Sequence, residues 1–353
     1  MCPNLEIFVM DWPMGMAFRP IAYALCTYCV KSLRSVRWHV PYEAVPKVIW
    51  ALDTLQSLQS VYIEVAAPVT GTIHLSSAAD LQLELKNLQQ LSLQGHFQDL
   101  LEQITGWSLP SLHSVSFNFL ATNDLPDIME FLTHHGSELT FLDLHCEPTP
   151  NTAAILDLCP FLTTFTFNAD GLPSTPGAVS PSDVVTLVNR PHQNITQIGL
   201  HGLLQAFGAV SRKDDIQTHR IQTKNETNIA ALTKANFPNL KKVRVLSRPL
   251  LRKLEKSDGP EEEYLERWDR WWTRFAGMRV RLEDCTGALL GTLPQVRTDE
   301  GSSEEESEDE GDENIGGPRL SHGVVSELRQ LLEECWKMSE EREEFSLPEV
   351  GWQ

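Results

Sequence analysis

The chain has 353 residues, and its 48 acidic side chains outnumber its 29 basic ones, which gives a formal net charge of −19. This charge argues against a protein that binds nucleic acid through a basic surface. The sequence is 41% hydrophobic and 22% charged, as in ordinary folded proteins, so a wholly disordered chain is also excluded. The charge is uneven, because residues 298–353 hold 18 acidic and 4 basic side chains.

A short template recurs along the first two thirds of the chain: Leu-x-x-Φ-x-Φ, where Φ is apolar. Its nine copies begin at Leu5, Leu33, Leu58, Leu88, Leu112, Leu139, Leu162, Ile195 and Leu240. Most of the gaps between them lie near the 20 to 29 residues of leucine-rich repeats. Each copy predicts a strand with positions +3 and +5 from the anchor on a buried face and +4 and +6 on the opposite face.

Segments with helical periodicity lie between several of these strands. The apolar stripes are Val45/Val48/Ile49/Leu52, Leu100/Ile104/Trp107, Leu125/Ile128/Leu132 and Val184/Leu187/Val188. Asn123 or Asp124 is expected to cap the third helix, and Ser182 or Asp183 the fourth, since such side chains accept hydrogen bonds from first-turn amides. We therefore expect each strand to be followed by a helix. The pattern predicts an α/β fold, an irregular leucine-rich-repeat-like solenoid of parallel strands alternating with helices. A compact doubly wound α/β domain is the alternative, but its glycine-rich phosphate turn is missing.

The solenoid is expected to span residues 1–290 and to end in an aromatic helix near residues 261–276. Tyr264, Trp268, Trp271 and Phe275 form a stripe on that helix, which predicts a cap over the end of the last repeat. Because Arg267, Arg270 and Arg274 lie beside the rings, single-stranded nucleic acid is a second possible ligand of this helix, and a protein partner a third. The cap is the favoured interpretation.

The last part of the chain has a different composition. Residues 291–320 are predicted to be an acidic disordered linker, because residues 299–313 contain ten acids and no large apolar side chain. Ser302, Ser303 and Ser307 each have an acid three residues later, which is the context that an acidophilic casein-kinase-type enzyme favours. Residues 321–340 are predicted to form a C-terminal amphipathic helix that docks on the solenoid or on a partner, and residues 341–353 a tail.

We expect an intracellular protein, cytoplasmic or nuclear, with no membrane association. No run of about 18 apolar residues could span a bilayer, and the first residues lack the pattern of a signal peptide. The seven cysteines are odd in number and scattered, which favours free thiols over a disulfide framework. Cys26 and Cys29 have the spacing of half a zinc site, but no second ligand pair follows, so we expect buried helix cysteines.

Several segments resemble the irregular leucine-rich repeats of F-box proteins, especially the expanded family of mushroom-forming (basidiomycete) fungi. They are Cys2-Pro3-Asn4-Leu5, Leu109-Pro110-Ser111-Leu112-His113-Ser114-Val115 and Cys159-Pro160-Phe161-Leu162-Thr163-Thr164-Phe165. The resemblance covers roughly residues 1–290. It implies that the repeats capture a protein substrate while an N-terminal F-box binds the Skp-type adaptor of a cullin ubiquitin ligase. The first repeat begins at Cys2, so we expect this chain to lack the F-box and to bind the adaptor only if an F-box exists upstream.

The expected function is that of a non-catalytic protein–protein interaction module, like the substrate-recognition part of an F-box ubiquitin-ligase receptor. The partner is expected to bind the concave strand face, at the +4 and +6 positions Arg37, His39, Tyr62, Glu64, Gln94, Asn118, Asp143, His145, Asn168, His201 and Arg244. We rank Arg37, Tyr62 and Arg244 first, since interface hot spots favour Tyr and Arg. An acidic histone-binding or chaperone-like protein that acts through residues 299–313 is the alternative function.

No catalytic residue, metal or cofactor is predicted, and the sequence has no phosphate loop, nucleophile elbow or HExxH helix. Asp143 and His145 share one strand face, where they could ligate a metal with His201 or act with it as acid and base. A recognition face is the favoured interpretation of these three residues, and no nucleic-acid partner is expected.

Overall fold

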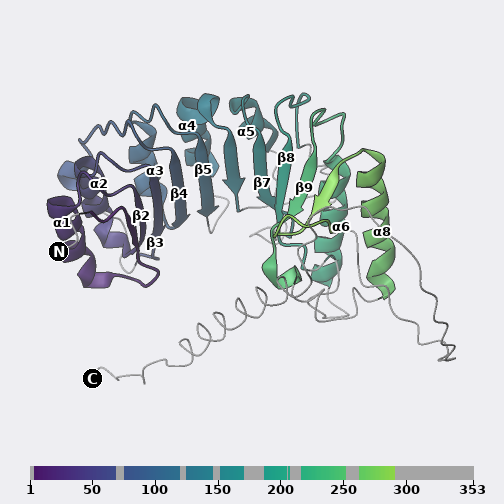
Figure 1. Cartoon of the computed structure of the whole chain (residues 1–353), viewed down its shortest axis with the longest axis horizontal. Coiled ribbons are helices and arrows are strands. Elements are labelled where there is room, and N and C mark those ends of the chain that lie inside the picture. The colour runs from purple at the N-terminus through teal and green to yellow at the C-terminus, as the bar shows by residue number, and fades with distance from the viewer. Residues whose placement is uncertain are drawn as a thin grey trace, which may run out of the picture. The chain divides into compact units, whose positions relative to one another are not determined.

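The computed structural model describes residues 4–68, 75–119, 125–145, 152–170, 187–204, 206, 216–251 and 262–290. The chain divides into two units, Met1–Arg297 and Thr298–Gln353, and every described residue belongs to the first. That unit is built on one ten-stranded sheet in which chain order is also spatial order, and every neighbouring pair of strands is parallel. Figure 1 shows the strands following one another in this order.

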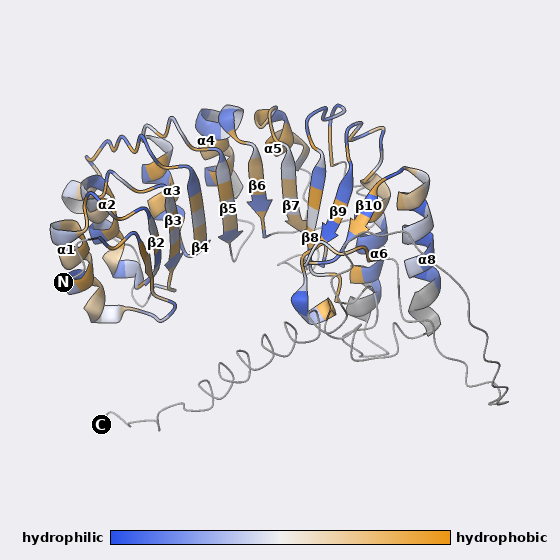
Figure 2. Ribbon diagram, viewed as in Figure 1, coloured by the Kyte–Doolittle hydropathy of each residue, from blue (hydrophilic) through white to orange (hydrophobic). Residues whose placement is uncertain are grey.

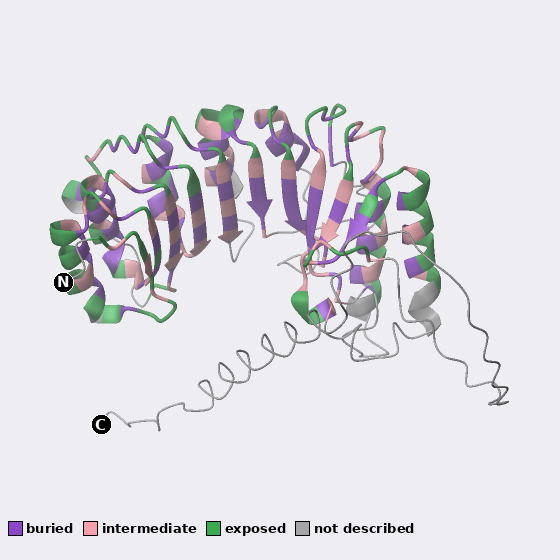
Figure 3. Ribbon diagram, in the orientation of Figure 1, coloured by how far each residue is buried: buried purple, intermediate pink, exposed green. Residues whose placement is uncertain are grey.

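Nine of the ten strands coincide with the nine sequence templates, so those nine predictions are confirmed. The strands are β1 (Ile7–Val9), β2 (Ser35–Val40), β3 (Ser60–Val65), β4 (Gln90–Gly95), β5 (Ser114–Phe119), β6 (Phe141–Leu144), β7 (Thr164–Asn168), β8 (Gln197–His201), β9 (Lys242–Val245) and β10 (Arg281–Glu283). From β2 to β9, the +3 and +5 side chains of every template are at most 3% exposed. The template therefore encodes the buried face of the sheet. Figures 2 and 3 show the corresponding changes of hydropathy and of burial from residue to residue along the strands.

The helices pack against that buried face and share one apolar core with the strands. They are α1 (Phe18–Tyr28), α2 (Val45–Thr54), α3 (Gln98–Thr105), α4 (Leu125–His135), α5 (Thr152–Leu158), α6 (Ile216–Ala231) and α8 (Glu262–Gly277). The predicted stripe of α2 is confirmed, as are Leu100 and Ile104 of α3 and Ile128 and Leu132 of α4, which are all at most 1% exposed. Trp107 is buried just after the end of α3, and the side chain of Leu125 lies outside the described residues. The predicted α/β class and parallel sheet are therefore confirmed.

Two expectations about the helices need correction. Between β3 and β4 the described residues contain a 3-10 turn, Ser76–Ala78, in place of an α-helix. Leu187 and Val188 are buried as expected, but they lie in a non-helical segment, because an irregular loop can bury two adjacent apolar side chains as well as a helix can. Val184 and the four proposed cap residues, Asn123, Asp124, Ser182 and Asp183, lie outside the described residues.

The aromatic helix α8 forms as predicted, but its expected place at the end of the repeats was wrong. The chain continues from α8 into β10, which pairs in parallel with β9 and is the last strand of the sheet. Trp268, Trp271 and Phe275 are each at most 4% exposed. The helix α8 is therefore part of the connection between the parallel strands β9 and β10, like the helices between earlier strands.

A single carboxylate ties α8 to α6, which lies beside it in Figure 1. Glu226 of α6 accepts hydrogen bonds from Arg267 Nε at 2.9 Å, Arg270 Nη2 at 2.8 Å and Trp271 Nε1 at 2.9 Å. Arg274 Nη2 donates to the carbonyl of Ala230 at 2.5 Å. The arginines that suggested a nucleic-acid ligand thus face α6.

Cys26 and Cys29, which have the spacing of half a zinc site, lie at the end of α1. The expectation of buried helix cysteines is confirmed in part: Cys26 lies within α1 but is half-buried, and Cys29 is buried but caps the helix after Tyr28. Of the helices that the structure describes, none has both the length and the apolar composition that crossing a membrane requires.

Several predictions concern residues outside those that the structure describes. They are the linker (291–320), the C-terminal helix (321–340), the tail (341–353) and the phosphorylation sites Ser302, Ser303 and Ser307.

The burial of the template residues can be tested at Leu144, which is 1% exposed in the centre of the sheet. We expect Leu144→Ala to lower the free energy of unfolding by about 2–5 kcal/mol, because the lost methyl groups leave a cavity. Chemical denaturation measures this change. Phe161→Ala is the control, since Phe161 is 60% exposed and its loss should cost no more than about 0.5 kcal/mol. Equal effects of the two substitutions would contradict the assignment of the buried face.

Candidate functional site

The parallel register lines up the polar side chains of the other, solvent face in two rows. The +4 row contains Val9, Arg37, Tyr62, Ser92, Ser116, Asp143, Thr166, Gly199, Arg244 and Glu283. The +6 row contains His39, Glu64, Gln94, Asn118, His145, Asn168 and His201. Neighbouring strands are about 4.8 Å apart, so each side chain can contact the next member of its row. All eleven residues predicted from the sequence lie in these two rows.

Ten of the eleven are at least partly exposed, as expected of a binding face. Asp143 is the exception, because it is only 9% exposed. The expectation that it is an accessible strand residue was wrong, since His145 and His201 cover its carboxylate. The sequence could not show this, because the two histidines come from different strands.

Near β1 the face combines apolar, aromatic and cationic groups. The Arg37 guanidinium lies 4.4 Å from the centre of the Tyr62 ring and pairs with Asp11 at 3.0 Å. The Tyr62 hydroxyl donates a hydrogen bond to Gln94 Oε1. Burial raises the pKa of Tyr62, although the Arg37 charge opposes part of the rise, so the hydroxyl remains a donor. Val9, at the +4 position of the first template, is 52% exposed beside Arg37 and was missed.

In the middle of the sheet, two imidazoles converge on one carboxylate. His201 Nε2 lies 3.0 Å from Asp143 Oδ1, and His145 Nε2 lies 3.2 Å from Asp143 Oδ2. The two imidazole rings are 3.8 Å apart between centroids, with 30° between their planes. Ser116 Oγ donates a longer hydrogen bond, 3.4 Å, to Asp143 Oδ2. We call Asp143, His145 and His201 the Asp–His cluster.

The environment keeps the Asp143 carboxyl ionised. Burial alone would raise its pKa, but the hydrogen bonds and charges of His145 and His201 outweigh burial and lower the pKa to about 2. A buried carboxylate is tolerated only where such partners compensate for lost solvation. The Asp–His cluster therefore presents a fixed negative charge beneath two imidazoles at the surface of the sheet.

Small residues on β7 and β8 allow His201 to reach Asp143 across the intervening strand. Thr166 and Gly199 are the +4 residues of these two strands. A Cβ at position 199 would lie 2.6 Å from Thr166 Oγ1, so any larger residue there would force the Thr166 side chain to shift. His201 is followed by Gly202, whose φ of +83° suits glycine and turns the chain away at the end of β8.

At the other end of the face, Arg244 is bound within the chain. Its Nε and Nη2 atoms donate to Glu283 Oε2 at 3.1 and 2.7 Å, and the Glu283 side chain is 4% exposed. Arg244, one of the three residues ranked first for partner binding, thus has a structural role that the sequence did not reveal. Glu283 belongs to β10, which no template predicted.

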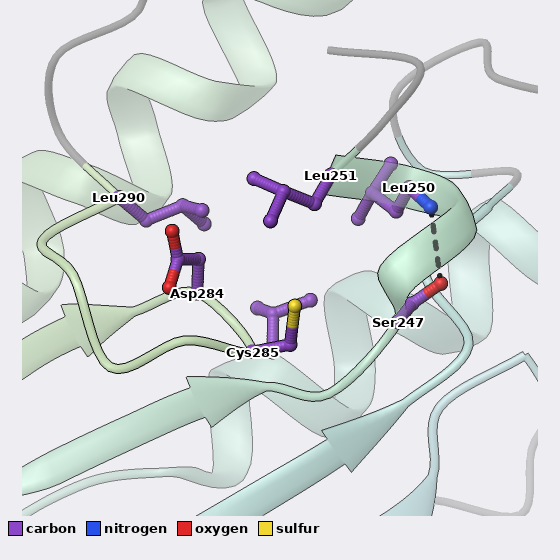
Figure 4. A pocket seen from close by; sticks show the side chains of 7 residues that line it. Ser247, Leu250, Leu251, Asp284, Cys285 and Leu290 are labelled. Carbon is purple, nitrogen blue, oxygen red and sulfur yellow. Dashed lines mark hydrogen bonds between the residues drawn. The ribbon is translucent and has the colours of Figure 1, made fainter. Parts of the chain in front are cut away.

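A pocket lies at this end of the sheet, away from the Asp–His cluster. It is lined by Val245, Ser247, Leu250, Leu251, Asp284, Cys285 and Leu290, as Figure 4 shows, and has no enclosed space large enough for a water molecule. Ligand pockets commonly have about 300–1,000 Å³. Asp284 Oδ1 already accepts hydrogen bonds from Thr286 and Ala288. We therefore base the functional argument on the solvent face of the sheet.

No family model matches this chain, and searches of curated proteins and of solved structures gave no significant match. Function must therefore be argued from the two rows of side chains, in which we distinguish the segment near β1, the central Asp–His cluster and the Arg244–Glu283 pair.

The different roles of the two arginines can be separated by stability. Arg244→Ala should lower the free energy of unfolding by about 1–3 kcal/mol, because it leaves the buried Glu283 carboxylate short of hydrogen-bond donors. Arg37→Ala should cost only about 0–1 kcal/mol, since Arg37 and Asp11 are both largely exposed. Urea denaturation of the two variants provides the comparison. An Arg37→Ala protein that is the less stable of the two would contradict it.

Proposed function

We propose that this protein is a leucine-rich-repeat-like interaction protein that binds a protein partner along the solvent face of its parallel sheet. The observation that carries the proposal is the pair of side-chain rows, which align polar and aromatic groups from neighbouring strands on the face opposite the helices. Repeat proteins use such extended faces for binding, because neighbouring repeats contribute side chains at a constant spacing.

The segment near β1 is the part of the face best suited to a hot spot. Interface hot spots are enriched in Trp, Tyr and Arg. Arg37 and Tyr62 are stacked on each other, and Val9 adds exposed apolar area. Trp12, in the segment after β1, is 75% exposed. On either side of it, the backbone amides of Met10 and Met14 donate hydrogen bonds to carbonyls of β2. An arginine held against a tyrosine ring loses less conformational freedom on binding than a fully mobile one.

The resemblance to F-box proteins suggests the biological role. On this proposal the face selects a protein substrate for a cullin ubiquitin ligase in the cytoplasm or nucleus. The alternative, an acidic histone-binding or chaperone-like protein, is supported by the ten acids of residues 299–313. The negative charge of that segment would attract basic partners.

A substitution series distinguishes the two proposals once proximity labelling has identified the partner. Arg37→Ala combined with Tyr62→Ala should weaken partner binding by at least about 30-fold, because loss of hot-spot residues costs about 2 kcal/mol or more. Phe161→Ala, which removes an exposed ring outside the two rows, should leave affinity unchanged. Calorimetric titration measures both, and thermal melting checks that the variants are folded.

The opposite pattern would overturn the proposal. If affinity survives the double substitution but disappears on deletion of residues 299–313, binding depends on the acidic segment. A strong decrease of affinity with rising salt would accompany that result, because exposed charges are screened.

A further inference from the structure

The Asp–His cluster places three metal-binding side chains of two strands at one point of the solvent face. Asp143, His145 and His201 each offer one ligand atom, and these atoms lie within 4.8 Å of one another. Both histidines direct Nε2 toward the same carboxylate, at 3.0 and 3.2 Å. We propose that Asp143, His145 and His201 form a zinc site with three protein ligands and one position open to solvent.

The distances between the donor atoms suit an ion bound among them. Zinc binds imidazole nitrogen and carboxylate oxygen at about 2.0–2.2 Å. Two ligands of a tetrahedral ion at that bond length are about 3.4 Å apart. The observed nitrogen–oxygen distances, 3.0 and 3.2 Å, are slightly shorter than this and end on different oxygens of the carboxylate. All three donor atoms lie within 4.8 Å of one another, so an adjustment of the side chains brings them around one zinc ion.

The chemistry of the three residues also favours zinc over hard cations. Two imidazoles and one carboxylate are the donor set of open zinc sites, whereas magnesium and calcium prefer oxygen ligands throughout. The Asp143 carboxylate supplies the one oxygen ligand of this set. Ser116 Oγ, 3.4 Å from Asp143 Oδ2, is positioned to orient that carboxylate as an outer-shell partner.

The scaffold around the three residues is rigid. Asp143 lies within β6 and His201 ends β8, and the backbone amide of His145 donates to the carbonyl of Phe117 in β5 at 2.9 Å. Sites on strands hold ligand geometry better than sites on mobile loops. His145 and His201 are 32% and 21% exposed in their side chains, so an ion can enter from solvent.

This inference departs from the sequence-based expectation of no metal and does not depend on the identity of a protein partner. The open fourth position would hold water in the isolated protein. Because the site lies in the same two rows as the proposed binding face, a histidine, cysteine or carboxylate of a partner could replace that water.

The test is titration of the chelator-treated full chain with zinc chloride in a calorimeter. We expect one zinc ion per chain, released protons, and a higher melting temperature of the zinc-loaded protein. His145→Gln together with His201→Gln should reduce affinity by more than the roughly 10- to 100-fold that outer-shell changes cost. His39→Gln is the matched control, because His39 also faces a carboxylate, that of Glu64, but has no second histidine. Its zinc affinity should equal that of the wild type.

Cobalt(II) provides a second measurement that tells these ligands from the cysteines of the chain. The cobalt-loaded protein should show visible bands of a tetrahedral or five-coordinate ion without an intense thiolate-to-cobalt band in the near ultraviolet. If the double variant fails to fold, His145→Gln alone replaces it, because His145 is the most exposed of the three ligands. No zinc binding by the folded wild type, unchanged affinity in the histidine variant, or a thiolate spectrum would each overturn the proposal.

Discussion

The constant register between parallel strands is the constraint on which the rest of this structure depends. Every strand pairs with its neighbours so that +3 meets +3 and +4 meets +4 of the next template. A shift by one residue would turn a whole strand over and expose its apolar side chains. The leucine anchors and the apolar +3 and +5 residues therefore determine which side chains remain for function.

The solvent face holds both structural residues and candidate functional residues, because the constant register brings charged side chains close together there. Asp143 and Glu283 are both buried carboxylates, and each is compensated at least in part by a residue of another strand. Two histidines contact Asp143, while Arg244 and, at 3.5 Å, Arg281 pair with Glu283. The Arg244–Glu283 pair connects the last two strands of the sheet, whereas the side chains of His145 and His201 remain accessible from solvent. This difference is why we assign a structural role to the first pair and a ligand role to the second.

Much of the fold could be predicted from the sequence, because burial of alternate residues leaves a direct pattern. The exceptions have physical reasons. The strand β10 has Arg279 with a positive φ at its anchor and Asp284 at +5, so its pattern lacks two of three apolar residues. The site was only partly predictable: the rows follow from the template, but the approach of His201 to Asp143 depends on the small residues of β7 and β8.

Disulfide trapping tests the register most directly. Gln90 pairs with Ser114 in the parallel arrangement, whereas Asn118 is four residues further along β5 and about 13 Å away. Two cysteines form a disulfide only when their Cα atoms are about 4.4–6.8 Å apart. Mild oxidation of Gln90→Cys/Ser114→Cys should therefore yield the cross-linked peptide in a mass spectrum, and Gln90→Cys/Asn118→Cys should not. Efficient cross-linking of the second pair but not the first would show that these strands are antiparallel and would contradict the account.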